Sequence, residues 1–285
     1  METLVLPTEL ERHVFELCVC SRPETVPTLM LVAWRVKEWV EPFLYRTLIT
    51  LPLLLVDRYP MLTERTLSTV LRSKPPAFFH NSVRHLFVYT FRSDFVKFVL
   101  SICTGVQNLW SFQASNLLVD LSVKPLPLKR LHTTPMPLFL NVSPSDPLFS
   151  RLTHLELMGS PKEDIDISAT LALLPRLTHL AFNENHTAML ISSYNSVLHN
   201  CTSLLVLVSL RGRSFATSSL HEEYEDDLLQ DSRFVVVTIG CLWFEDWQME
   251  VLNGTGYWNQ AEAFIAKRRA GEIDATEYMI PYCTS

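Results

Sequence analysis

A six-residue pattern that returns after 25 residues constrains the fold of this chain most strongly. The two clearest copies run from Leu152 to Leu157 and from Leu177 to Phe182, and both begin with Leu-Thr-His-Leu. Apolar spacing of this kind at intervals of about 20–29 residues predicts a solenoid, in which every repeat supplies one strand and one return segment. Solenoids present a long surface to a partner, so the pattern favours binding over catalysis.

Weaker copies of the pattern precede and follow these two. The central apolar residues of the seven predicted strands are Leu86, Leu109, Leu131, Leu155, Leu180, Leu207 and Val237. The intervals between them are 23, 22, 24, 25, 27 and 30 residues, and helical spacing separates several of the strands. We therefore predict an α/β fold, a leucine-rich-repeat-like solenoid of parallel strands with outer helices over residues 81–245. The alternative is chance spacing in a chain that is 48% hydrophobic.

The composition favours a folded protein that keeps its cysteines reduced. Only 19% of the 285 residues are charged, which argues against disorder, and the net charge of -6 argues against a nucleic-acid partner. The six cysteines lack the spacing of zinc sites. Neither a secretory signal nor an apolar run of membrane length is visible, so we expect a cytoplasmic or nuclear protein without a membrane partner.

Motifs of common enzymes are missing from the sequence. It contains no G-x-S-x-G, no P-loop, no G-x-G-x-x-G and no H-E-x-x-H. We therefore expect a non-enzymatic protein with no cofactor, and we assign neither catalytic nor metal-binding residues. An enzyme would need a deep pocket lined by several polar groups with perturbed pKa values.

The first 48 residues carry no copy of the repeated pattern. They are predicted to form a separate unit of three short helices. One apolar stripe at helical spacing runs from Leu10 to Leu17, and a second runs from Leu29 to Val40. A unit of about 45 residues is near the lower limit for an independent hydrophobic core. We therefore expect it to dock on the solenoid or on another protein.

Four short motifs follow one another within this unit. They are Leu6-Pro-Thr-Glu-Leu10, Val14-Phe-Glu-Leu17, Leu31-Val-Ala-Trp-Arg35 and Pro42-Phe-Leu-Tyr-Arg-Thr-Leu48. Their order and spacing resemble the F-box, a helical module that docks on a Skp-family adaptor of cullin-based ubiquitin ligases. The F-box pattern usually carries a tryptophan where this sequence has Val36. Residues 28–48 and 261–273 also resemble large families of fungal F-box-like proteins that carry no established activity.

An F-box followed by leucine-rich repeats implies a substrate-recognition subunit of a Skp–cullin–F-box ubiquitin ligase, with an unknown protein as its target. The resemblance implies that the adaptor is contacted by Leu6, Pro7, Leu10, Val14, Phe15 and Val32. The alternative is a binding scaffold without a ligase role, in which residues 1–48 only cap the solenoid. Such a cap would bury Leu6, Pro7 and Leu10 against the first repeat.

Side chains alternate along a strand, so the residues that flank each central apolar residue should face a concave surface. We predict that the target binds there to His85, Phe87, Trp110, His154, Glu156 and His179. Phe87 and Trp110 are expected either to anchor a partner or to be covered by loops. His154 and His179 should be stacked neighbours on adjacent strands. With no third ligand in view, we interpret them as a repeated polar surface and not as a metal or pH-sensing site.

Two further segments complete the predicted domain organisation. Residues 49–80 are expected to form a connecting helix or linker. Residues 246–285 are expected to form a C-terminal helical cap that closes the open end of the solenoid. Its main helix, over 257–270, carries an apolar stripe and is ended by Gly271.

Overall fold

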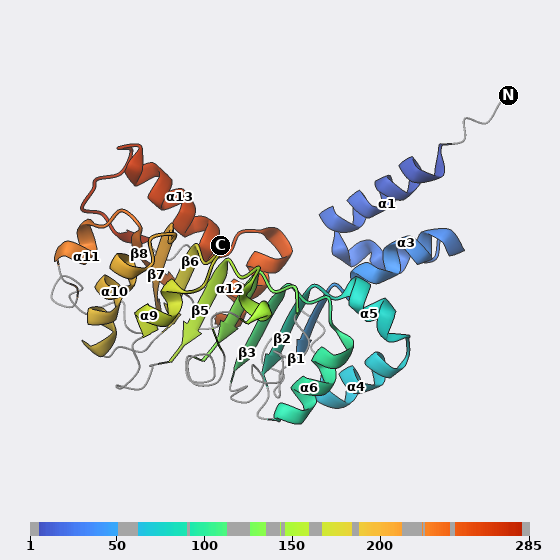
Figure 1. The fold of residues 1–285 in the computed structure, drawn as a ribbon. Helices are drawn as coiled ribbons and strands as arrows, with labels where there is room; N and C mark the ends of the chain where they lie inside the picture. The colour runs from blue at the N-terminus through green and yellow to red at the C-terminus, as the bar shows by residue number, and fades with distance from the viewer. Residues whose placement is uncertain are drawn as a thin grey trace.

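The computed structural model describes residues 6–50, 62–89, 92–112, 126–134, 143, 146–159, 167–183, 188–212, 224, 226–239 and 243–280. Within them the strands form one sheet of nine strands, parallel throughout and ordered as in the chain (Figure 1). The strands are β1 (Thr47–Thr50), β2 (His85–Tyr89), β3 (Asn108–Phe112), β4 (Arg130–Thr133), β5 (His154–Met158), β6 (His179–Asn183), β7 (Val206–Gly212), β8 (Phe234–Ile239) and β9 (Met279–Ile280). The predicted α/β class with a parallel sheet is confirmed.

The helices after β1 belong to two groups. The return helices between strands are α4 (Glu64–Arg72), α5 (Pro76–Ser82), α6 (Ser93–Ile102), α9 (Ile167–Ala172), α10 (Ala188–Asn200) and α11 (Asp226–Gln230), with a short 3-10 turn, η2 (Pro147–Phe149). The C-terminal helices are α12 (Trp243–Asn253) and α13 (Tyr257–Arg269). None of the helices in the described residues is long and apolar enough to cross a membrane.

The main hydrophobic core lies between the sheet and the return helices. The central leucines of neighbouring strands stand in register, so that Leu109 pairs with Leu86 on one side and with Leu131 on the other. These leucines are buried together with apolar side chains of the return helices, such as Val99 of α6 and Val197 of α10. The inward direction predicted for the apolar residues of the L-x-x-L-x-L pattern is therefore correct across the central strands.

The predicted register is wrong at β8. Leu207 pairs with Phe234, three residues before the predicted Val237, so the last interval is 27 residues and not 30. Phe234 and Val236 enter the main core, whereas Val235 and Val237 face the opposite side of the sheet. Alternation specifies register only where polar and apolar residues alternate. The apolar run from Phe234 to Val237 offers no such contrast.

The C-terminal helices do not close the end of the sheet as predicted. In Figure 1, α12 and α13 lie along the face of the sheet opposite α6, which is the face predicted to be concave. Ala261 and Ile265 of α13 pack there on Val206, Val208 and other side chains of β7 and β8. We call this side of the sheet, with the outward residues of β2 to β8, the covered face. The chain then returns as β9, which pairs with β8 at the end of the sheet.

The N-terminal residues form a small helical unit, the headpiece, which projects beyond β1 in Figure 1. It contains α1 (Thr8–Ser21), a 3-10 turn η1 (Pro23–Thr25), α2 (Val26–Leu29) and α3 (Trp34–Leu44). Its own core is formed by Val19, Val26, Val36 and Val40. Val36 is thus a buried core residue, and the ring of Trp39 lies 6.4 Å from that of Phe15 beside it. The ion pair between Lys74 and Glu41, 2.7 Å long, joins the headpiece to the α4–α5 segment.

Candidate functional site

The headpiece exposes an apolar stripe along α1. Leu10, Val14 and Leu17 are each half-exposed at i, i+4 and i+7 spacing, because Val19 supplies the buried contact of this helix with α2 and α3. Leu6, just before the helix, is 50% exposed. Soluble proteins seldom leave large apolar side chains gathered on one small unit, so the stripe has the character of a contact surface.

A second exposed apolar segment connects α2 to α3. Leu31 is 86%, Val32 60% and Trp34 71% exposed. The next residue, Arg35, forms a bidentate hydrogen bond with Glu11 of α1, with N–O distances of 2.8 and 3.1 Å. This pair lies at the surface and holds the start of α3 beside α1, next to Leu10. The exposed segment before α3 therefore lies beside the Leu10 end of the stripe.

Five of the six residues implied to contact an adaptor are exposed, namely Leu6, Pro7, Leu10, Val14 and Val32. Phe15 is half-buried and packs against the headpiece core. Its ring therefore stabilises the headpiece as well as lying near the stripe, so substitution of Phe15 would confound folding with binding.

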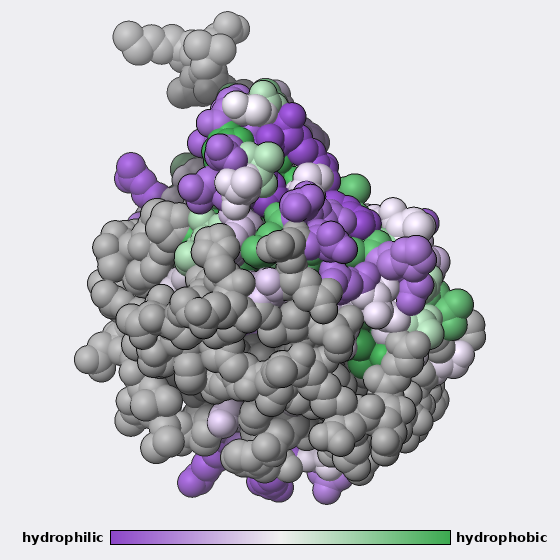
Figure 2. Space-filling model, turned by 90° about the vertical axis from the view of Figure 1, so that its left-hand side faces the viewer, coloured by the Kyte–Doolittle hydropathy of each residue, from purple (hydrophilic) through white to green (hydrophobic). Residues whose placement is uncertain are grey.

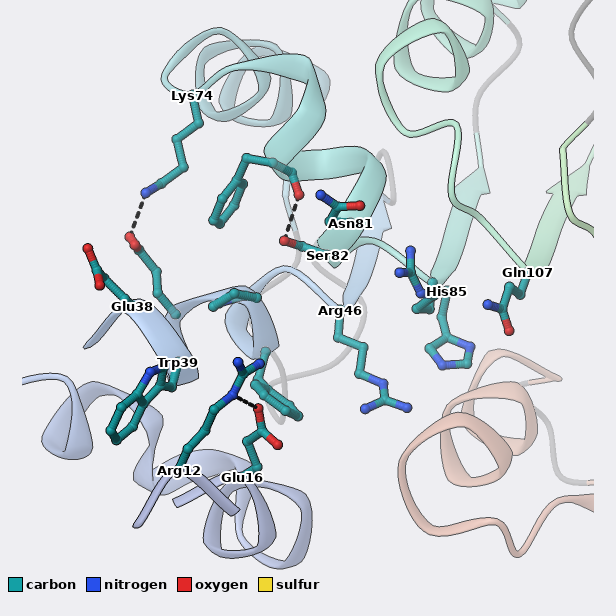
Figure 3. A pocket seen from close by; sticks show the side chains of 15 residues that line it. Arg12, Glu16, Glu38, Trp39, Arg46, Lys74, Asn81, Ser82, His85 and Gln107 are labelled. Carbon is teal, nitrogen blue, oxygen red and sulfur yellow. Dashed lines mark hydrogen bonds and ion pairs between the residues drawn. The ribbon is translucent and has the colours of Figure 1, made fainter. Parts of the chain in front are cut away.

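A cleft of about 740 Å³ lies between the headpiece and the first strands of the sheet (Figure 3). Its charged groups are largely paired within the protein. Arg12 bonds to Glu16 at 2.7 Å, and Lys74 bonds to Glu41 at the same distance. Arg46 and His85 point toward the sheet end of the cleft in Figure 3. Charges of both signs are therefore mixed along the cleft.

The covered face carries a buried hydrogen-bond network centred on Glu156. Its carboxylate lies 2.6 Å from Nδ1 of His132 and accepts from the Tyr257 hydroxyl at 2.8 Å and from the Asn183 amide at 2.7 Å. Burial opposes ionisation of Glu156, but the charge and hydrogen bond of His132 and the bonds from Asn183 and Tyr257 bring the net pKa below its ordinary value. Burial and the neighbouring Glu156 raise the pKa of Tyr257 well above its ordinary value. The network keeps a buried carboxylate ionised and ties α13 to β5.

Aromatic side chains fill the covered face beneath α12. Phe87 and Trp110 stack with ring centroids 4.1 Å apart, and Trp247 packs edge-on against Phe87 at 5.2 Å. The indole of Trp247 also donates a hydrogen bond to Asn108 at 3.2 Å. Next along the sheet, Arg130 forms an ion pair with the buried Glu250 of α12. The contacts of Trp247 with Phe87 and Asn108, and that of Glu250 with Arg130, join α12 to β2, β3 and β4.

Two histidines occupy the covered face beneath α13. His154 and His179 stack with ring centroids 4.0 Å apart and planes 6° from parallel. Trp258 meets both rings edge-on, at 5.3 and 5.7 Å. His179 also lies 2.8 Å from the carboxylate of Glu262. The stacking of the two histidines was expected from their places on adjacent strands, whereas the carboxylate beside them was not.

The covered face is therefore not the open surface expected for target binding. Of the residues predicted to form it, Phe87, Trp110, Glu156 and His179 are buried, and His85 and His154 are half-buried. Among the residues that the structure describes, helices α12 and α13 form this cover. The spacing of their apolar residues predicted helix 257–270 but carried no information on which face of the sheet it would cover.

Burial of His85 predicts that the protein loses stability in mild acid. Burial, and then the positive charges of Arg46, Arg130 and Arg84, lower the pKa of His85 to about 4. The unfolded chain, with a histidine pKa of about 6.5, therefore binds the proton first as the pH falls. The contribution of His85 to the free energy of unfolding should be fully present above about pH 6.5. It should fall toward pH 4 by at most about 1.4 kcal/mol per pH unit.

Urea unfolding of the wild type and His85→Asn at pH 7 and pH 5 measures this contribution. We expect the loss between the two pH values to be smaller in His85→Asn. His13→Asn is the control. Because His13 is exposed, this substitution should leave the loss of stability between the two pH values unchanged. Equal losses in the wild type and His85→Asn would contradict a neutral, buried His85.

Comparison with protein-family models, with curated proteins and with solved structures finds no match to this chain.

Proposed function

We propose that this protein is a non-enzymatic interaction subunit that docks on a Skp-family adaptor and serves as the substrate-recognition component of a Skp–cullin–F-box ubiquitin ligase. The observation that carries the proposal is the exposed apolar surface of the headpiece, formed by the stripe on α1 and by the segment that connects α2 to α3. Leu10 and Val32, both within F-box-like motifs, are 53% and 60% exposed. Apolar side chains of this size supply the central contacts of protein interfaces when a partner covers them.

The exposure of the stripe favours docking over a capping role for the headpiece. A cap would place Leu6, Pro7 and Leu10 against the first strand, but all three are exposed. The headpiece instead meets the remainder of the protein through α3, which contacts α5. Val36, which departs from the F-box pattern, lies buried in the core of the headpiece and so does not form part of the exposed surface offered to an adaptor.

The remainder of the chain would be a leucine-rich-repeat-like scaffold that holds the target. The parallel strands in chain order and the inward leucines support this interpretation. The proposal does not place the target on the covered face, because α12 and α13 would first have to separate from it. Target recognition would then belong to the outer surface of the molecule. In Figure 2, hydrophilic residues predominate over hydrophobic ones among the coloured residues on the side nearest α11 and α13.

Binding of purified full-length protein to a Skp-family adaptor tests the docking function. We expect Leu10→Asp/Val32→Asp to weaken binding at least about 30-fold, because charges would replace apolar contacts worth about 2 kcal/mol. The matched control is Leu173→Asp/Leu205→Asp, which places the same charges at two positions 65% and 51% exposed on the scaffold. The control should bind as the wild type does.

The thermal unfolding of both double variants should match that of the wild type, because the four side chains are exposed. Calorimetric titration with the adaptor then reports binding alone. Equally weak binding by the wild type and Leu10→Asp/Val32→Asp would refute the ligase role and favour a scaffold without one.

A further inference from the structure

Each of the stacked histidines of the covered face contacts the hydroxyl of the threonine that precedes it. Nδ1 of His154 lies 2.8 Å from the hydroxyl of Thr153, and Nδ1 of His179 lies 2.8 Å from the hydroxyl of Thr178. Each hydroxyl donates its single proton to a backbone carbonyl, that of Lys129 or of Thr153. A hydroxyl that donates to its carbonyl can accept from Nδ1 of the histidine, and this tautomer leaves the lone pair of Nε2 available to an ion.

Helix α13 brings a carboxylate to these lone pairs. Oε1 of Glu262 lies 2.8 Å from Nε2 of His179. A shared positive ion, either a proton or a metal ion, would hold these two atoms at this distance. One ligand atom each of His154, His179 and Glu262 lies within 4.8 Å of the other two. The structure thus supplies the third ligand that the sequence lacks around the two histidines.

We propose that His154, His179 and Glu262 bind a divalent transition-metal ion of the zinc class, and that this ion fastens α13 to strands β5 and β6. Two imidazoles and a carboxylate are typical zinc ligands, and a fourth position is left for water. Glu262 is 49% exposed on its side chain, so the ion can enter from solvent. Hydrogen bonds to the second ring nitrogen, here from the histidines to Thr153 and Thr178, are the usual outer support of histidine ligands.

An aromatic ring and charges of both signs surround the site. Trp258 covers the edges of both histidine rings and shields them from solvent. Arg130, which forms an ion pair with the buried Glu250, also places a positive charge near both histidines, and Glu262 supplies negative charge at the site. Ligands of a tetrahedral zinc lie about 3.3 Å apart, given bonds of about 2.0–2.1 Å. The ion would therefore draw the parallel rings together at their Nε2 atoms.

Zinc titration of the chelator-treated full-length protein tests the site. We expect one zinc ion per chain to bind at this site in the wild type. Glu262→Gln should weaken that binding at least about 100-fold, since a first ligand is lost. The exposed Glu272 provides a matched control, because Glu272→Gln should bind zinc as the wild type does. Thr178→Val, which removes only the support of His179, should weaken binding about 10–100-fold.

Cobalt(II) absorption distinguishes this site from the exposed thiols of Cys18 and Cys20 on α1. Nitrogen and oxygen ligands should give visible bands without the strong ultraviolet band of a cobalt–thiolate bond, and these bands should be absent in Glu262→Gln. A thiolate band, or equal zinc affinity in the wild type and Glu262→Gln, would overturn the proposal. Failure of the wild type to bind zinc or cobalt would also overturn it, and would leave His179 and Glu262 as a proton-linked pair.

Discussion

Replacing Glu156 with alanine should destabilise the protein by about 3–5 kcal/mol, the cost of removing one partner from a buried charged network. The carboxylate accepts hydrogen bonds from Asn183 and Tyr257 and pairs with His132, and the alanine would leave these groups buried and unpaired. Urea unfolding at pH 7 measures the effect as a lower midpoint with an unchanged slope. At this pH Glu156 is ionised, because its pKa is lowered in the folded state.

Two further variants distinguish the stability lost with the buried network from the stability lost on removing any glutamate. Glu156→Gln keeps the shape and one acceptor oxygen, so its loss should be smaller than that of Glu156→Ala. Glu272→Ala removes an exposed carboxylate and should change stability by less than about 0.5 kcal/mol. Equal small losses in Glu156→Ala and Glu272→Ala would contradict an ionised Glu156 that anchors α13.

The strands could be predicted from the sequence wherever apolar and polar residues alternate. The segment from Leu152 to Leu157 predicted both the strand and the direction of each side chain, and the contacts agree. The prediction failed at β8, where three consecutive valines remove the contrast that sets register. It missed β1 because Thr47 and Leu48 end a motif that favours the headpiece. It missed β9 because two residues are too few to carry a periodic pattern.

The candidate sites were predictable only in part, for a related reason. Alternation placed His154, Glu156 and His179 on the correct face of the sheet, since that assignment depends on neighbouring residues alone. Their partners come from far along the chain. Tyr257 bonds to Glu156 across 101 residues, and Glu262 bonds to His179 across 83. No local spacing records such a contact, so neither the cover nor the carboxylate beside the histidines could be foreseen.

Replacing Trp247 with alanine should destabilise the protein by about 3–5 kcal/mol, the usual cost of truncating a buried aromatic side chain. Trp247 is 2% exposed, packs against Phe87 and donates a hydrogen bond to Asn108. Its loss would leave a cavity over the stacked rings of β2 and β3. Trp34→Ala is the matched control, because Trp34 is 71% exposed and its loss should cost less than about 0.5 kcal/mol.

The same variant decides whether α12 is part of the folding unit or a separable cover. Arg130, Glu250, Tyr257 and Glu156 are all buried or half-buried where the C-terminal helices meet the sheet, and breaking these contacts separately would leave charges unpaired. We therefore expect Trp247→Ala to unfold in one transition at lower urea, with hydrogen exchange accelerated in β2, β3 and α12 together. A main transition unchanged from the wild type, with faster exchange confined to α12, would instead show that the helix separates from an otherwise stable sheet. In that event the covered face would become available to a partner, and Phe87 and Trp110 would regain the role of anchors predicted for them.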